Sequence, residues 1–134
     1  MHHIKLNMNY QDLNDKLKEI KNEEIVWIIY IGIIIFSFYS NSLERKYYLY
    51  NDYNSKIKYR QTLIIIFSIL IVVYLYFLKD AYDSLKALKK EDSSQKKNLV
   101  LLSFIGSLLI AISGFIFLYI AYKDESLDVE IAFN

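Results

Sequence analysis

The sequence predicts an all-α integral membrane protein, with three transmembrane helices in an up-down bundle. Three observations support this fold class: three long stretches without a charged residue, a helical period in the N-terminal segment, and the complete absence of proline. The 134-residue chain is 54% hydrophobic, only a little above soluble domains, but its apolar residues are concentrated in blocks. A chain of this length is enough for one domain.

The three uncharged blocks comprise residues 25–43, 61–78 and 98–122. A membrane-spanning helix needs about 20 mainly apolar residues, within a range of about 17–25, so each block is long enough. A helix that is apolar on every face must be buried on every face, and a soluble chain this short cannot enclose three of them. The remaining alternative has two spans and a middle helix that lies on the membrane surface.

An N-terminal amphipathic or polar segment, residues 1–24, precedes the 25–123 transmembrane domain. Its apolar residues recur at spacings of three and four, which predicts a helix, and Asn9 is a candidate N-cap. The period is set by Tyr10, Leu13, Leu17 and Ile20. Three interpretations remain open: a helix on lipid headgroups, a seam against a partner helix, or a solvated lead-in to the first span.

The pattern predicts helices over about residues 23–50, 55–91 and 97–123. The second helix therefore projects beyond its apolar block, and turn formers at residues 51–54 and 91–95 separate the three. The acidic tail, residues 124–134, alternates apolar and polar side chains at Leu127, Val129, Ile131 and Phe133. We expect a disordered terminus, the alternative being a strand added to a partner's sheet.

Six small residues in the third block predict a helix-packing face. At about 100° per residue they all lie within roughly 160° of the helix circumference. They are Ser103, Gly106, Ser107, Ala111, Ser113 and Gly114. Small residues allow helices in lipid to approach closely, so another helix should pack there. That helix is either the chain's own first or second span or one in another subunit; a polar pore lining is a weaker alternative.

Tyrosine and tryptophan side chains gather at the ends of the blocks, where aromatic residues anchor proteins at membrane–water boundaries. The predicted interfacial anchors are Trp27, Tyr30, Tyr47, Tyr48, Tyr50, Tyr59, Tyr119 and Tyr122. Basic residues accompany them in the first connection, which favours binding to anionic headgroups over recognition of a ligand or peptide.

The distribution of Lys and Arg predicts the orientation. Ten of the 16 lie in the N-terminal segment and the second connection, and six in the first connection and tail. The positive-inside rule then favours a cytoplasmic N-terminus and a C-terminus outside the cell membrane.

The sequence gives little support for a catalytic, metal-binding or cofactor-binding function. The absence of cysteine excludes thiol catalysis and disulfides, and a net charge of +1 gives no argument for nucleic acid. No span carries a charged residue for a proton relay, and no catalytic or cofactor-binding motif is present. His2 and His3, the only histidines, are expected in a disordered terminus without a metal. We therefore predict no enzyme, no catalytic or metal site and no cofactor.

We therefore expect the protein to lie in the lipid bilayer and to act through helix–helix contacts, either with copies of itself or with another membrane protein. The leading prediction is an accessory or regulatory subunit, or a small protective protein of bacteriocin-immunity type, by analogy of size and topology. The alternative is a homo-oligomeric pore former of holin type, on an equally general analogy. A composition rich in Ile, Lys, Asn and Tyr is associated with AT-rich codons and suggests a bacterial source.

Overall fold

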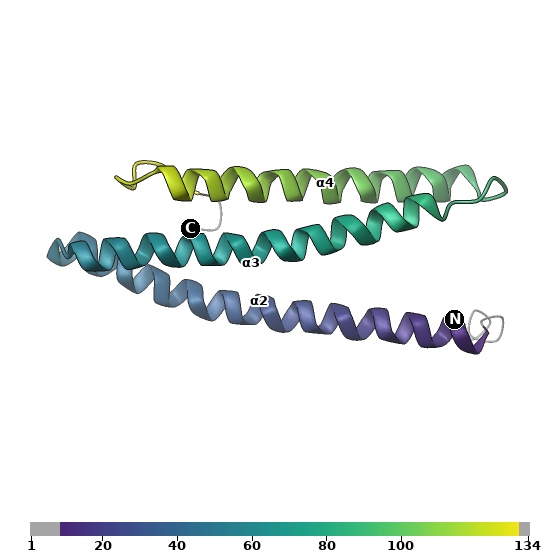
Figure 1. Ribbon diagram of the computed structural model, residues 1–134, viewed down its shortest axis with the longest axis horizontal. Helices are drawn as coiled ribbons and strands as arrows, with labels where there is room; N and C mark the ends of the chain where they lie inside the picture. Colours follow the sequence, from purple (N-terminus) through teal and green to yellow (C-terminus); the bar gives the residue numbers. More distant parts are fainter. Residues whose placement is uncertain (1–8, 132–134) are drawn as a thin grey trace. The chain divides into compact units, whose positions relative to one another are not determined.

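The computed structural model describes residues 9–131, which form three α-helices joined by short connections (Figure 1). The helices are α2 (Tyr10–Tyr50), α3 (Tyr53–Lys86) and α4 (Ser94–Lys123), and no strand occurs within residues 9–131. Each helix contains a stretch long and apolar enough to cross a membrane. The prediction of an all-α chain with three long apolar helices is confirmed, and the up-down bundle stays a prediction.

The chain forms two compact units, Met1–Ile35 and Phe36–Asn134. The boundary falls within α2, which continues for 41 residues without a break between the N-terminal segment and the first apolar block. Asn9 caps this helix, since its side-chain oxygen accepts the backbone N–H of Asp12 at 2.7 Å. Whether residues 10–24 lie on lipid or on a partner stays a prediction.

The connection between α2 and α3 is only two residues long. Asn51 has a φ of 53°, in the left-handed region that asparagine tolerates better than most residues. Asp52 is the N-cap of α3, because its carboxylate accepts the backbone N–H of Asn54 and the hydroxyl of Ser55. The Ser55 hydroxyl is the main cause of a lowered pKa at Asp52. This confirms the turn predicted at residues 51–54.

Helices α3 and α4 pack side by side as an antiparallel hairpin (Figure 1). The Phe67 and Phe117 rings lie 5.9 Å apart, and those of Tyr82 and Phe104 lie 6.0 Å apart. With the hydrogen bond from Arg60 to the Tyr122 carbonyl, the contact extends over most of both helices. The core lies mainly along α3, whose buried apolar residues are Tyr59, Leu63, Ile66, Phe67, Leu70, Ile71, Val73 and Ala81. In the hairpin, α3 is therefore the more enclosed helix.

The second connection begins earlier than the sequence predicts. Helix α3 ends at Lys86, short of residue 91, and α4 begins at Ser94, ahead of residue 97. The reason is local capping: the Ser93 hydroxyl accepts the backbone N–H of Lys96 at 3.1 Å and starts α4 there. Helix α3 still continues eight residues past its uncharged block, or about 12 Å at about 1.5 Å per residue.

The tail after α4 forms a compact turn over its described residues, 124–131, and no strand. The Asp124 carboxylate accepts the backbone N–H groups of Asp128 at 3.0 Å and Val129 at 2.8 Å, and Leu127 has a φ of 56°. Ile131 is buried while Val129 is exposed, so the predicted alternation does not make one common face. Phe133 lies outside the described residues.

Candidate functional site

The small residues of α4 fall into two groups in the structure. Ala111 and Gly114 are buried, and Gly114 lies against α3. A Cβ added at Gly114 would lie 3.0 Å from Tyr74 Cδ2 and 3.2 Å from Ile71 Cγ1. Ser107 is half-buried, and the helical period places it on the same side of α4 as Phe104, Ala111 and Gly114. At Gly114 the predicted face is therefore occupied by the chain's own α3.

Gly106, Ser103 and Ser113 are placed differently. No atom lies within 4 Å of a Cβ built at Gly106, and Ser103 and Ser113 are exposed. The Ser113 hydroxyl donates to the Leu109 carbonyl at 2.9 Å, within the same helix. Gly106 and Ser113 therefore form a second, open strip on α4, about 100° around the helix from the α3 contact.

The predicted aromatic anchors also differ in their surroundings. Exposed side chains belong to Trp27, Tyr48, Tyr50, Tyr119 and Tyr122. Tyr30 and Tyr47 are half-buried; Trp27 meets Tyr30 edge to face at 5.7 Å, and the Lys56 ammonium lies over the Tyr47 ring. Tyr59 is 3% exposed and is part of the core of the second unit.

A buried hydroxyl pair joins α2 to α3, and no feature of the sequence distinguishes it from the other serines and threonines in the blocks. Ser40 is fully buried, and its Oγ lies 2.8 Å from Thr62 Oγ1. Thr62 donates to the Tyr59 carbonyl at 2.6 Å, so its single proton is used and Ser40 donates to Thr62. Both hydroxyl donors are thus satisfied, although the two residues lie in the first and second uncharged blocks.

A cavity of about 840 Å³ lies within the second unit, among the end of α2, the first turns of α3, the end of α4 and the tail. Its apolar lining includes Leu63, Ala121 and Ile131, all of them buried. Its charged lining consists of one guanidinium and four carboxylates: Arg45, Glu44, Asp124, Asp128 and Glu130. These residues come from distant parts of the sequence, and only the fold brings them together.

Asp124 links this cavity to the end of α4. The hydrogen bond from the Val129 N–H lowers the pKa of Asp124, and that from Asp128 and the positive charges of Arg60 and Lys56 act in the same direction. Arg60 also donates from Nη2 to the Tyr122 carbonyl at 2.9 Å, which satisfies a carbonyl at the C-terminus of α4. The carboxylate of Asp124 is therefore committed to holding the tail.

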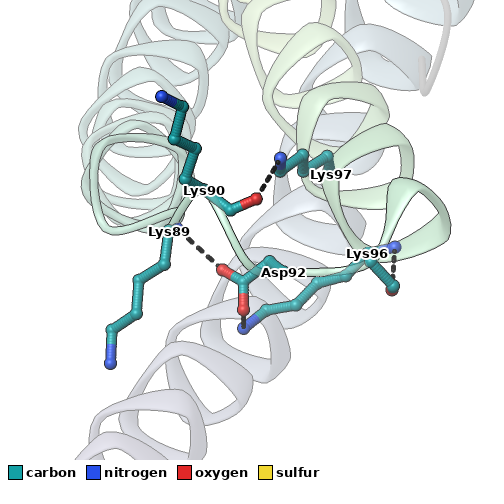
Figure 2. Close-up of polar contacts among 6 residues, drawn as sticks. Lys89, Lys90, Asp92, Lys96 and Lys97 are labelled. Atoms are coloured by element: carbon teal, nitrogen blue, oxygen red, sulfur yellow. Dashed lines mark hydrogen bonds and ion pairs between the residues drawn. The ribbon is translucent and has the colours of Figure 1, made fainter.

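Lysines gather at the opposite end of the α3–α4 hairpin (Figure 2). Asp92 organises them: its carboxylate accepts the Lys89 backbone N–H at 2.7 Å and the Lys96 ammonium at 3.3 Å. The backbone hydrogen bond from Lys89 is the main cause of a lowered pKa at Asp92. The Lys97 ammonium donates to the Lys90 carbonyl at 3.0 Å, while the ammonium groups of Lys89 and Lys90 point away from Asp92.

No group of three His, Cys, Asp or Glu side chains within residues 9–131 is placed to hold a metal ion. His2 and His3 lie outside the described residues. Comparison with protein-family models, with curated proteins and with solved structures gave no match.

Proposed function

We propose that the chain is a multi-pass protein of a bacterial cell membrane that acts through helix–helix contacts and not through catalysis. In this proposal it is an accessory or regulatory subunit of a larger membrane protein, or a protective protein of immunity type. Its N-terminus lies in the cytoplasm and its C-terminus outside, as the distribution of Lys and Arg favours.

The observation that supports this function best is the open strip at Gly106 and Ser113. Side chains of α3 already occupy the space beside Gly114, but no atom of the described residues lies within 4 Å of a Cβ placed at Gly106. In a bilayer, helix association depends on close backbone approach, and a glycine facing outward from a packed hairpin allows it. We therefore assign the partner contact to Gly106 and the internal contact to Gly114.

Cross-linking in the native membrane tests this function. We expect one adduct heavier than the 16.0 kDa chain that contains a second, different protein. Gly106→Leu should abolish this adduct, because the larger side chain keeps the partner backbone away. Leu109→Ile is the matched control, since it changes side-chain shape on the same helix without changing size, and it should leave the adduct intact.

The outcomes separate the proposed function from its rival. A ladder at multiples of the chain mass, together with leakage of the membrane on overproduction, would favour the homo-oligomeric pore of holin type. An adduct that forms equally well with Gly106→Leu would contradict the assignment of the partner contact to the open strip.

A further inference from the structure

We infer that the lysine end of the α3–α4 hairpin, residues 86–97, binds anionic phospholipids together with the exposed leucines at the start of α4. Lysine ammonium groups hold the lipid phosphates, and the leucines contact the acyl chains. The inference rests on the membrane location proposed above, but it does not depend on the partner contact at Gly106. Every residue that it uses belongs to the second unit, Phe36–Asn134.

The uncharged blocks of the two packed helices differ in length. Residues 61–78 of α3 rise about 27 Å, close to the ~30 Å of a hydrocarbon core, whereas residues 98–122 of α4 rise about 37 Å. The hydrogen bond from Arg60 to the Tyr122 carbonyl brings the two blocks to the same level at the tail end of the hairpin. The surplus length of α4 therefore falls at the lysine end.

The contact between the Tyr82 and Phe104 rings agrees with this offset. Because the helices are antiparallel, it places residues 99–105 of α4 beside the charged last turns of α3, residues 79–86. Tilting accommodates a single long span, but it shifts both ends of one helix in the same direction relative to the other, so it cannot align both pairs of ends. The first two turns of α4 therefore lie at the depth of the lipid headgroups, where the hydrocarbon core has ended.

This part of α4 is apolar and open. Its large exposed side chains, which are 41–61% accessible, are Leu99, Leu101, Leu102 and Ile105. Leucines inside the hydrocarbon core are covered by bulk lipid, but apolar surface at headgroup depth is covered only if an apolar group is held there. An acyl chain reaches this depth when its headgroup is held farther out, beyond the start of α4.

The lysine end can hold a headgroup in that position. Five lysines lie within residues 86–97 against two carboxylates, and the Asp92 carboxylate already accepts the Lys96 ammonium and the Lys89 backbone N–H. The ammonium groups of Lys89 and Lys90 point away from Asp92, and they make no hydrogen bond or ion pair with any residue in the range 9–131 (Figure 2). Lysine clusters beside a span attract anionic headgroups, whereas a zwitterionic lipid brings an ammonium that lysines repel.

A local quenching experiment in lipid nanodiscs tests this surface. A fluorophore on Asn98→Cys, the only thiol in the chain, reports acyl chains beside the start of α4 when the added lipid carries brominated chains. We expect phosphatidylglycerol to occupy this surface roughly 25-fold more tightly than phosphatidylcholine, a factor of about five (~1 kcal/mol) for each of two free lysines. Lys89→Gln with Lys90→Gln should lower the preference by the same factor. Lys56→Gln with Lys58→Gln removes equal charge at the opposite end of the hairpin and is the matched control, which should keep it.

Leu99→Ser with Leu102→Ser provides a second measurement, because quenching by both lipids should fall when the acyl chain loses its apolar surface. Equal quenching by the two lipids in the parent protein overturns the inference and leaves an acidic segment of a partner protein as the occupant. An unchanged preference in the Lys89 and Lys90 variant, an equal loss in the control, or undiminished quenching in the serine variant also overturns it. Incorporation into nanodiscs is scored separately: failure there contradicts the membrane location, whereas incorporation without lipid preference contradicts only the lipid surface.

Discussion

Gly106 and Gly114 lie eight residues apart on α4, and side chains at these two positions would meet different surroundings. At Gly114 the new atoms would meet Tyr74 and Ile71 of α3, and at Gly106 they would meet no atom of the described chain. The same substitution therefore distinguishes contacts within the chain from contacts with a partner. The two hydroxyls of Ser40 and Thr62 provide a similar single-residue test for α2 and α3.

Gly114→Leu should destabilise the α3–α4 hairpin by about 1–3 kcal/mol, the usual cost of overpacking. A Cβ at this position already approaches Tyr74 Cδ2 to 3.0 Å, so the further carbons force the two helices apart. Reversible unfolding in mixed micelles measures the effect. Gly106→Leu is the control and should unfold like the parent protein; equal destabilisation by both variants would contradict the difference between the two glycines.

Thr62→Val should destabilise the second unit by about 0.6–2 kcal/mol, because it leaves the buried Ser40 hydroxyl without its acceptor. Adding Ser40→Ala should recover part of the loss, since no polar group then stays unpaired. A double-mutant cycle measured by the same unfolding assay gives the coupling between the two positions. Additive effects would show that the 2.8 Å contact contributes no coupling energy.

At the scale of the elements, the C-terminal end of α4 is held by two polar contacts. Arg60 of α3 donates to the Tyr122 carbonyl, and Asp124 accepts N–H groups from the tail that follows. Since Arg60 is also among the charges that favour the ionised form of Asp124, the helix end and the tail are electrostatically linked. The tail is thus ordered by a carboxylate that must be ionised.

The order of the tail should depend on pH. Its hydrogen bonds lower the pKa of Asp124 in the folded chain below the ordinary value of 3.8. The stabilisation is therefore present above pH 3.8 and is lost as the pH falls through the lower folded pKa. A spin label on Ser126→Cys, the only thiol in the chain, should become mobile only below about pH 3.8.

Asp124→Ala is the control for the pH experiment. The variant has no acceptor for the backbone N–H groups of Asp128 and Val129, so the label should be mobile at every pH. The population with a detached tail should grow roughly fivefold for each ~1 kcal/mol of stabilisation that the tail loses. A parent tail that stays ordered at every acidic pH, or one that is mobile at neutral pH, would contradict the role of Asp124.

At the scale of the whole molecule, the two ends of the α3–α4 hairpin differ in chemistry. One end carries the lysines around Asp92, and the other carries the cavity with its four carboxylates. This difference has a consequence for orientation, because lysines near the ends of spans are retained on the cytoplasmic side.

The lysine end should therefore face the cytoplasm and the tail should face outward. Because the chain has no cysteine, single substitutions can be labelled without background. An impermeant maleimide applied to intact cells should modify Ser126→Cys and should modify Gln95→Cys only after permeabilisation. The reverse labelling pattern would show that the protein is inserted with the opposite orientation.

Much of the fold can be predicted from the sequence because its determinants are local. The three uncharged blocks predict three long helices, and Asn51 and Asp52 predict the first turn, since both depend on neighbouring residues. The sequence predicts the ends of the second connection less accurately. The Ser93 hydroxyl caps the start of α4, and beyond the end of α3 the Asp92 carboxylate accepts the backbone N–H of Lys89. A helical period of about 3.6 residues places the six small residues on one side of a helix.

Tertiary structure alone decided what those side chains contact. The helical period groups Gly106 with Gly114, but the position of α3 fills one and leaves the other open. It likewise buries Tyr59, pairs Ser40 with Thr62, and brings Glu44 of α2 and Asp128 of the tail to one cavity. The sequence determined that the chain forms helices able to enter a membrane, because hydropathy and backbone hydrogen bonding act over neighbouring residues. Only the packed structure decided which surfaces remain for ligands and partners, because that depends on contacts between residues far apart in the chain.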